Sequence, residues 1–295
     1  MNKDLLISGF SDEISSDFDT QLEVVSNLGM HYLSLRGIDG KNIGDYTVDE
    51  IKENVQPRLQ KAGIGVSSIG SPIGKVFIND EDGFANQKIM LDTLCQISNL
   101  LNCQYIRIFS FYIPKGDNAD QYREEVVSKL KEYAAIAEKY NVILLHENEK
   151  DIFGDIGRRC HEILTEVDSP YFKGIFDFAN FVQCGEDTQE CYDLLKDEIV
   201  YIHIKDAVTS DSQNVVCGTG EGKIPELLAQ FIKSGYKGFL TLEPHLVLFD
   251  SLKDLELEDA TEIIKDNKGL DGAGGYKLQY EALLEILKTI ESEEK

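Results

Sequence analysis

Short apolar runs and amphipathic segments alternate along the whole chain. The apolar runs predict buried strands at 5–10, 31–36, 64–69, 104–110, 142–147, 174–177, 199–205 and 238–243. The segments between them repeat apolar residues every three or four positions, which predicts helices, at 17–28, 47–62, 83–101, 119–140, 156–167, 188–195, 223–234 and 276–290. Strands that alternate with helices, without hairpin signals, predict an all-parallel sheet. Eight such units predict an α/β protein, a (β/α)8 TIM barrel, as a single domain over residues 1–295.

Alternation within the predicted strands assigns each side chain to one face, because neighbouring strand residues point to opposite sides of a sheet. His203 lies between two isoleucines, and Glu243 follows a Leu-Thr-Leu stretch. Arg36 likewise follows a Leu-Ser-Leu stretch, and Arg107 lies between two isoleucines. These four polar residues are therefore predicted to point toward the barrel mouth, while the apolar residues beside them face the surrounding helices.

Four residues at the ends of successive predicted strands are candidate metal ligands: Glu147, Asp177, His203 and Glu243. In α/β folds, ligands bind at this carboxyl end of the strands. Three carboxylates that meet in a partly desolvated place repel one another strongly, and a divalent cation would relieve the repulsion. One nitrogen among several oxygens suits Mn²⁺ or Mg²⁺, with Co²⁺ or Zn²⁺ as alternatives. The pattern predicts one divalent metal ion, and a salt-bridge network is the competing interpretation.

Basic residues are predicted around the same mouth, namely Arg36, Lys75, Arg107 and Lys205. They would either bind substrate oxygens, including those of a phosphate or carboxylate, or pair with acidic residues nearby. The acidic residues available for pairing include Asp12, Glu13, Glu149 and Asp206. Lys75 follows a glycine-containing turn that could offer amide groups and positive charge together, so it is the candidate for binding a phosphate.

One predicted connection is long. Residues 244–275 join the last strand to the last helix, whereas βα connections commonly have about 2–6 residues. The segment includes a glycine-rich stretch at 269–275. We expect it to form a rim loop over the site.

Composition narrows the classes of partner. The chain has 29 basic and 53 acidic residues, a net charge of −24, which repels nucleic acid and anionic membrane surfaces. Its charged N-terminus and lack of a long apolar run lead us to expect neither a secretory signal nor a membrane span. Six cysteines without a CxxC pair favour a reducing compartment. We expect a cytoplasmic protein with a small-molecule partner, and a homo-oligomer is left open.

Four short sequences on the last four predicted strands resemble the sugar phosphate isomerase/epimerase group of the xylose-isomerase-like TIM barrels. They are LHENE at 145–149, FDFANF at 176–181, YIHIKDA at 201–207 and LEPH at 242–245. The segments 35–42 and 68–75 are also similar to this group. The resemblance implies a TIM barrel in which Glu147, Asp177, His203 and Glu243 bind the metal. It also implies that Glu147 and Glu243 act as acid/base groups.

Two positions depart from the ketose 3-epimerase branch of this group. That branch has a histidine three residues after the aspartate of strand six, where this chain has Asn180. It also has an arginine after the histidine of strand seven, where Lys205 and Asp206 follow here. The substrate is expected to contact Arg36, Lys75, Arg107, Asn180 and Lys205.

The chemistry that the resemblance implies is proton transfer next to a carbonyl group. The metal would bind a substrate carbonyl and the adjacent hydroxyl, polarise the C=O bond and stabilise the enediolate. Either Glu147 or Glu243 would remove the α-proton, and the other would return it to the opposite face or to the neighbouring carbon. The implied function is a metal-dependent isomerase or epimerase acting on a sugar or sugar phosphate.

Three other functions compete with this interpretation. A lyase or dehydratase acting on a keto-sugar or an inosose would begin with the same proton abstraction. A non-catalytic sugar-binding barrel would not need two glutamates on the metal. A nuclease similar to endonuclease IV would use several zinc ions and many histidines, but this chain has five histidines, of which one stands at a predicted ligand position.

Overall fold

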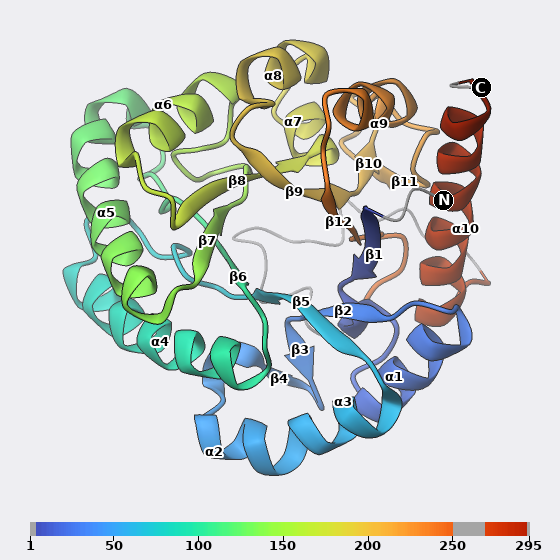
Figure 1. Cartoon of the computed structure of the whole chain (residues 1–295). Helices are drawn as coiled ribbons and strands as arrows, with labels where there is room; N and C mark the ends of the chain where they lie inside the picture. The colour runs from blue at the N-terminus through green and yellow to red at the C-terminus, as the bar shows by residue number, and fades with distance from the viewer. Residues whose placement is uncertain (1–3, 250–268, 294–295) are drawn as a thin grey trace.

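Eight parallel strands form a ring in the computed structural model, which describes residues 4–249 and 269–293 (Figure 1). The strands are β1 (Leu5–Gly9), β2 (Tyr32–Leu35), β5 (Gly65–Gly70), β6 (Tyr105–Ile108), β7 (Ile143–His146), β8 (Phe172–Asp177), β9 (Ile199–Ile204) and β12 (Gly238–Leu242). They are hydrogen-bonded in the order β1-β12-β9-β8-β7-β6-β5-β2. A parallel bridge between Phe10 and Ser34 connects the two ends of this sheet. The predicted α/β TIM barrel is confirmed, and the barrel is nearly closed.

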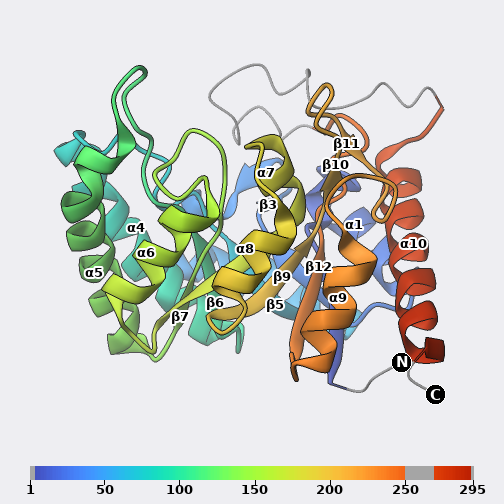
Figure 2. The same cartoon turned by 90° about the horizontal axis from the view of Figure 1, so that it is seen from above.

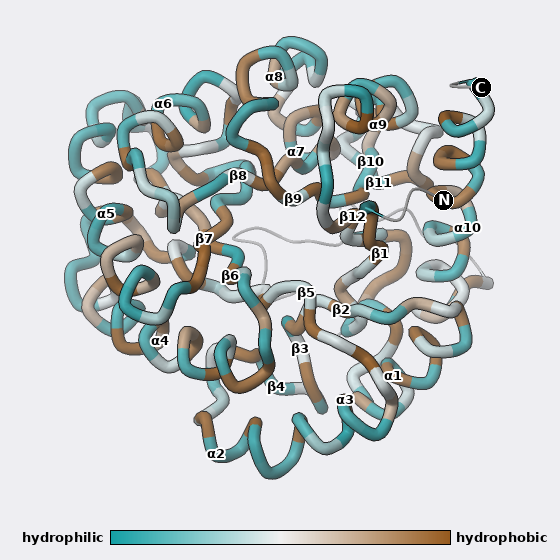
Figure 3. Tube along the Cα trace, in the orientation of Figure 1, coloured by the Kyte–Doolittle hydropathy of each residue, from teal (hydrophilic) through white to brown (hydrophobic). Residues whose placement is uncertain are grey.

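The helices lie outside the ring and turn their hydrophilic sides outward (Figure 3). They are α1 (Phe18–Asn27), α2 (Val48–Glu50), α3 (Gln56–Ala62), α4 (Glu81–Leu100), α5 (Arg123–Tyr140), α6 (Gly157–Val167), α8 (Thr188–Leu195), α9 (Ile224–Lys233) and α10 (Gly272–Glu293). Among the described residues, no helix has both the length and the apolar content needed to cross a membrane.

Three elements that the sequence did not predict lie in connections after the carboxyl ends of strands. They are the hairpin of β3 (Gly37–Ile38) and β4 (Lys41–Asn42), the hairpin of β10 (Asp206–Ala207) and β11 (Asn214–Val215), and the helix α7 (Phe178–Gln183). The elements α7, β10 and β11 gather at one end of the barrel (Figure 2). This end is therefore built up, as expected for a binding face.

The helical segment predicted at 47–62 is interrupted. Thr47 caps its start, because its hydroxyl accepts from the Glu50 amide while the Glu50 carboxylate accepts from the Thr47 amide. A π-helical turn at Ile51–Val55 then separates α2 from α3. Pro57 lies in the first turn of α3, and its ring cannot donate a hydrogen bond to the preceding turn. We attribute the widened turn to this proline.

The strand residues divide into an outer and an inner apolar cluster. Ile202 and Leu240 belong to the large cluster that includes residues of the surrounding helices. Leu145, Ile175 and Tyr201 form a separate cluster with its own set of neighbours. The alternation predicted from the sequence is therefore confirmed in these strands, and the inner residues fill the barrel as packed side chains.

Hydroxyl groups inside the barrel bond to one another beside the inner cluster. Tyr201 Oη accepts a hydrogen bond from Thr241 Oγ1 at 2.6 Å and donates one to Ser67 Oγ at 3.0 Å. Ser68 Oγ lies 2.9 Å from the same oxygen. The Tyr201 ring meets the ring of His203 edge-on, with 5.8 Å between centroids. Buried hydroxyls that have hydrogen-bond partners avoid a desolvation penalty. The network therefore holds the Tyr201 ring in place, and that ring supports the imidazole of His203.

The last helix begins earlier than predicted. The structure starts α10 at Gly272, inside the glycine-rich stretch at 269–275 that was expected to be loop. A Cβ atom at Gly272 would lie 2.4 Å from the carbonyl oxygens of Glu13 and Ile14, so glycine allows close backbone contact here. The predicted rim loop at 244–275 is otherwise mostly outside the described residues, because 250–268 are not described.

We predict that Gly272→Ala destabilises the protein by about 1–3 kcal/mol, the usual cost of forcing extra atoms into a packed place. Gly274→Ala is the matched control. Its added Cβ would meet only side-chain atoms, of Asp271 and Leu270 at 3.0 and 3.3 Å, and alanine favours helix by about 1 kcal/mol over glycine. Urea unfolding measures both variants, and equal midpoints for Gly272→Ala and the wild type would contradict the prediction.

Candidate metal centre

Four side chains from neighbouring strands converge at the carboxyl end of the barrel. Glu147 follows β7, Asp177 ends β8, His203 lies in β9 and Glu243 follows β12. Each offers a ligand atom, and these atoms lie within 4.8 Å of one another in a fully buried group. His203 Nδ1 is 2.6 Å from Glu147 Oε1, 3.1 Å from Glu243 Oε2 and 3.8 Å from Asp177 Oδ2. The structure thus brings together the four residues that the sequence singled out as metal ligands.

Asp177 is fixed by its position between a strand and a helix. It is the N-cap of α7, and its Oδ1 accepts a hydrogen bond from the Asn180 amide at 2.9 Å. Asn148 holds its backbone on both sides, because the Asn148 side chain donates to the Asp177 carbonyl and accepts from its amide, each at 3.0 Å. Only the second carboxylate oxygen, Oδ2, is left to face His203.

The two glutamates are held in a similar way, each by one arginine. Arg107 Nη1 donates to Glu147 Oε2 at 3.1 Å, and Arg36 Nη1 donates to Glu243 Oε1 at 3.0 Å. The other oxygen of each glutamate faces His203 Nδ1. All three carboxylates therefore have one anchored oxygen and one oxygen turned toward a common point.

The arrangement fits a divalent cation. Asp177 Oδ2 and Glu243 Oε2 are buried, and each lies beside a cation: Lys205 Nζ is 3.2 Å from Asp177 Oδ2, and His203 Nδ1 is 3.1 Å from Glu243 Oε2. The inward oxygens therefore stand where a positive charge is favoured. Metal–ligand bonds of about 2.0–2.2 Å place neighbouring ligand atoms roughly 3–3.5 Å apart, close to the separations around His203. Three inward oxygens and one imidazole nitrogen form the set that these residues would offer to an ion.

Charges in this cluster change the acidity of its members. Burial raises the pKa of Glu147, but the positive charges of His203 and Arg107 outweigh burial and lower it to about 2. Burial alone would lower the pKa of His203, but the adjacent Glu147 and Glu243 carboxylates raise it to about 9. Without a metal, His203 is therefore protonated near neutral pH, and an ion that binds its nitrogen must displace a proton.

Asp177 behaves differently from Glu147. Its burial raises its pKa to about 6, an effect that Lys205 opposes and the neighbouring glutamates reinforce. The Glu243 pKa is lowered well below its usual range, because Lys205 and the hydrogen bond to His203 outweigh burial. The three carboxylates do not ionise alike, and the site without a metal holds protons that a divalent ion would replace.

The cationic residues predicted to bind substrate are all in contact with acids. Lys205 Nζ lies 3.2 Å from Asp177 Oδ2 and 3.8 Å from Glu243 Oε2. Lys75 Nζ lies 3.0 Å from Glu149 Oε1. The pairing interpretation therefore holds for these residues and for Arg107. It does not by itself exclude substrate contacts, since Arg107 Nε has no hydrogen-bond partner among the described residues.

Arg36 is the most completely paired of these cations. Its Nε donates to Asp12 Oδ2 at 2.8 Å, and its Nη2 donates to Glu13 Oε1 at 3.2 Å, beside the bond to Glu243. The side chain is fully buried, and its guanidinium carbon lies 4.3 Å from the centre of the Phe10 ring. Its pKa is raised, because these carboxylates outweigh the effect of burial.

Asn180 and Asp206 have local roles that the sequence pattern did not reveal. Asn180 Nδ2 donates to the Asn148 carbonyl at 2.8 Å, which links α7 to the end of β7. Asp206 was a candidate partner of Lys205, but its carboxylate accepts instead from the amides of Gly218, Gly220 and Gly222 at 2.9–3.0 Å. The loop at 218–222, which contains these three glycines, therefore surrounds the buried carboxylate of Asp206 with backbone amide donors.

Three residues matter more to the site than their sequence positions indicated: Asn148, Glu13 and His245. Asn148 and Glu13 were noted only as part of a motif and as a pairing partner. His245 was not predicted to be buried, yet its side chain is 4% exposed and lies against Glu13 and Glu243. Its backbone has φ of +45°, and its amide donates to Glu13 Oε2 at 2.7 Å. The available sequence signal for His245 was Pro244, because a proline directly after a strand marks a turn that could bring the next side chain back toward the barrel.

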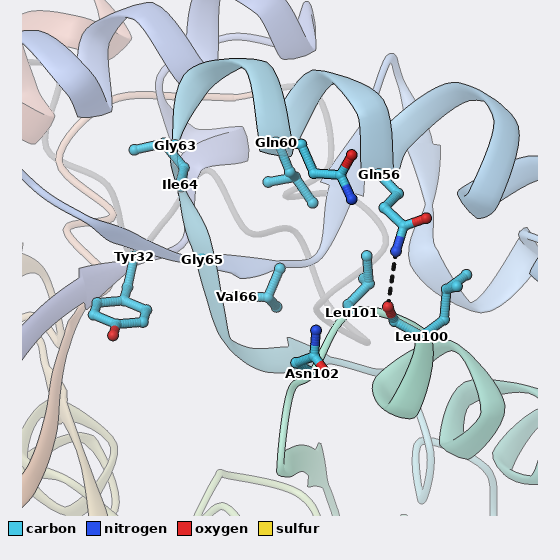
Figure 4. Close-up of a pocket in the computed structure, with 11 residues that line it drawn as sticks. Tyr32, Gln56, Gln60, Gly63, Ile64, Gly65, Val66, Leu100, Leu101 and Asn102 are labelled. Carbon is cyan, nitrogen blue, oxygen red and sulfur yellow. Dashed lines mark hydrogen bonds between the residues drawn. The ribbon is translucent and has the colours of Figure 1, made fainter.

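A separate cavity of about 380 Å³ lies beside Tyr32 and Gly65, where β2 and β5 begin (Figure 4). The metal-ligand cluster stands at the carboxyl ends of the strands, so the cavity lies at the opposite end of the barrel. Its lining includes the apolar residues Leu59, Val66 and Leu101. It also includes Gln56, whose Nε2 donates a hydrogen bond to the Leu100 carbonyl at 2.9 Å. Among the described residues that line it, the phenol of Tyr32 is the only acid or base, so this lining offers no carboxylate or imidazole for proton transfer.

The fold and the cluster define a TIM barrel with a buried carboxylate–histidine group at the carboxyl ends of its strands. The chain belongs to the xylose isomerase-like TIM barrel family, whose sequence model matches residues 22–289. The family resemblance seen in the sequence is thereby confirmed.

Known proteins that are similar to this chain include a dehydratase, the IolI protein and an epimerase-like protein. It is 25% identical over 124 residues to a 3-dehydroshikimate dehydratase of Bacillus anthracis. That match covers 42% of this chain and 44% of the dehydratase, so it spans less than half the length of that relative. The structure of the IolI protein with a binding zinc atom is similar with a TM-score of 0.75 at 15% identity, over 97% of this chain and 99% of that one. A D-tagatose 3-epimerase-like protein gives 0.72 at 16% identity, over 98% and 100%.

We predict that Mn²⁺ raises the melting temperature of the wild type and that Asp177→Asn loses most of this increase. An ion bound only by the folded state stabilises it, by about 2.7 kcal/mol at a hundred times its Kd. Asparagine keeps the N-cap of α7 but removes the charged oxygen. Asp187→Asn, at the N-cap of α8, is the matched control and should respond like the wild type. An unchanged response of Asp177→Asn would mean that Asp177 does not hold the ion.

Proposed function

We propose that this protein is a metal-dependent isomerase or epimerase that moves a proton next to the carbonyl of a sugar or sugar phosphate. The observation that carries the proposal is the arrangement of Glu147 and Glu243. Each presents one buried oxygen to His203 Nδ1, at 2.6 and 3.1 Å, and each is anchored by an arginine through its other oxygen. Two fixed carboxylates beside one substrate position are suited to remove and return a proton.

The steps can be assigned to residues of this chain. Glu147, Asp177, His203 and Glu243 would hold a divalent ion, and that ion, when bound, would polarise the substrate carbonyl and acidify the neighbouring C–H bond. One glutamate accepts this proton, and the electron pair of the C–H bond becomes the C=C bond of the substrate enediolate. For epimerisation, the second glutamate must start protonated; it gives its proton to the opposite face of the same carbon, and the two glutamates have then exchanged protonation states. For aldose–ketose isomerisation, the abstracted proton is returned to the next carbon while the hydroxyl proton moves from one substrate oxygen to the other.

The substrate would be positioned by residues at the edge of the cluster. We propose that Lys75, Arg107, Asn180 and Lys205 contact its oxygens. Support for Arg107 is its buried Nε, which has no hydrogen-bond partner in the described part of the chain. We assign Arg36, which the sequence placed in the same group, to holding Glu243 in place, because its Nε, Nη1 and Nη2 each donate to a carboxylate.

A dehydratase is the second candidate. The observation that favours it is the 25% identity to a 3-dehydroshikimate dehydratase. In that reaction the same first step removes the α-proton. The electron pair then expels a hydroxyl group from the next carbon, and a protonated side chain supplies the proton with which it leaves as water. The residues that remove the proton are common to both candidates.

Incubation of the Mn²⁺-loaded protein with a panel of keto-sugars in D₂O tests the proposal. We expect proton NMR to show loss of the signal next to the carbonyl of one sugar, followed by signals of its epimer or isomer. An unsaturated product would identify the dehydratase instead. Sugar binding without exchange anywhere in the panel would contradict proton transfer and support a binding protein.

We predict that Glu147→Gln and Glu243→Gln each lower turnover of that sugar by about 10²–10⁴-fold at saturating Mn²⁺, the usual loss when an acid–base group is removed. In an epimerase, one variant should still exchange substrate hydrogen with D₂O on the face served by the remaining glutamate. Glu198→Gln makes the same change in an ion pair with Lys173 near the start of β9 and should keep full turnover. Full turnover by either test variant would show that its glutamate is at most a ligand.

A further inference from the structure

A second group of possible ligands adjoins the first. One atom each from Glu13, Glu243 and His245 lies within 4.8 Å of the others, and all three residues are buried. Glu243 belongs to both groups. His245 Nε2 lies 3.4 Å from both Glu13 Oε1 and Glu243 Oε1. Neither ring nitrogen of His245 has a hydrogen-bond partner among the described residues, so the buried Nε2 contacts two carboxylates at ion-pair distance, outside regular hydrogen-bond geometry.

The guanidinium of Arg36 already uses the two oxygens of this group. Its Nη2 donates to Glu13 Oε1 at 3.2 Å, and its Nη1 donates to Glu243 Oε1 at 3.0 Å. It is enclosed between the rings of Phe10 and Phe249, whose centres lie 4.3 and 5.2 Å from its carbon. A divalent ion on the same oxygens would stand next to this buried positive charge, which is unfavourable in a desolvated place.

Charge balance at the mouth also favours a single ion. Six carboxylates pair with four cationic side chains: Asp12, Glu13 and Glu243 with Arg36, Glu149 with Lys75, Glu147 with Arg107, and Asp177 with Lys205. Six negative and four positive charges leave −2, with His203 neutral as metal binding requires. One divalent ion brings this set to zero, whereas two would leave an uncompensated +2 in a buried site, which is costly.

We propose that Arg36 takes the place of a second metal ion and so keeps the centre mononuclear. Removal of the guanidinium would leave the same set of groups at −3, so one divalent ion would leave −1 and a second would leave +1, a smaller excess than the +2 that a second ion leaves in the wild type. Glu13, Glu243 and His245 would then offer two oxygens and one nitrogen to a second divalent cation. The inference rests on the metal centre proposed above, and ion counting distinguishes failure of the one from failure of the other.

The test measures Mn²⁺ bound per chain by mass spectrometry of the metal after gel filtration, together with the Mn²⁺ EPR spectrum. We expect one ion in the wild type, with an isolated six-line signal. Arg36→Ala should bind two ions and show the broadened spectrum of a coupled pair that shares Glu243. Arg36→Lys, which keeps a positive charge, is the matched control and should bind one. The double variant Arg36→Ala with His245→Ala should also return to one.

Each outcome decides a separate point. No ion in the wild type would refute the metal centre itself. Two ions in the wild type, or one in folded Arg36→Ala, would overturn the role assigned to Arg36. Arg36→Ala leaves three buried carboxylates without their cation, so we expect a lowered melting temperature that excess Mn²⁺ restores. If this variant stays unfolded at every Mn²⁺ concentration while Arg36→Lys folds, an ion cannot replace the guanidinium and the proposal fails.

Discussion

The burial of several carboxylates at one point is the constraint on which the rest of this structure depends. Charged groups lose their hydration when they are buried, and like charges beside one another add repulsion. The chain meets this cost by giving each inward carboxylate a fixed partner for its other oxygen: Arg107 for Glu147, Arg36 for Glu243, and the first turn of α7 for Asp177. The inward oxygens are thereby oriented before any ligand arrives, and orientation that is settled in advance makes binding stronger.

The barrel provides the rigidity that such an arrangement requires. Below His203, the interior is filled by Tyr201 and its bonded hydroxyls and by the inner cluster of Leu145 and Ile175. Arg107 lies in β6, Arg36 directly follows β2, and α7 directly follows β8. The groups that anchor the three carboxylates are therefore held close to the sheet. The helix α10 is also held close to this region, because Gly272 lets its first turn approach the backbone of Glu13. Movement of that helix would therefore reach the network around Arg36.

Much of this arrangement was predictable because it depends on local pattern. Strand parity placed His203, Glu243, Arg36 and Arg107 at the mouth, since alternation in a strand is a property of the chain alone. Features that depend on contacts between distant segments were not predictable in this way. The glycines at 269–275 suggested loop, but Gly272 lies in a helix and allows a close approach to the backbone of Glu13 and Ile14, far away in sequence. The burial of His245 and the pairing of Arg36 with three carboxylates likewise depend on how β1, β2 and β12 lie relative to one another, which the sequence alone does not give.

The electrostatics of the two glutamates also restrict how the proposed chemistry can work. The pKa of Glu147 is lowered to about 2 by His203 and Arg107 in the site without a metal, and a divalent ion beside it would also keep this pKa low. Such a carboxylate is a poor base for a carbon-bound proton, because proton transfer is efficient when the donor and acceptor have similar pKa values. The positive charges of His203 and Arg107 beside Glu147, and of Lys205 and His203 beside Glu243, therefore weaken the two glutamates as bases. Acidification of the bound substrate must supply what base strength does not. The same partners that make a buried acidic cluster tolerable would thus make the proposed catalysis depend on a cation, and they connect the fold of the mouth to that proposed chemistry.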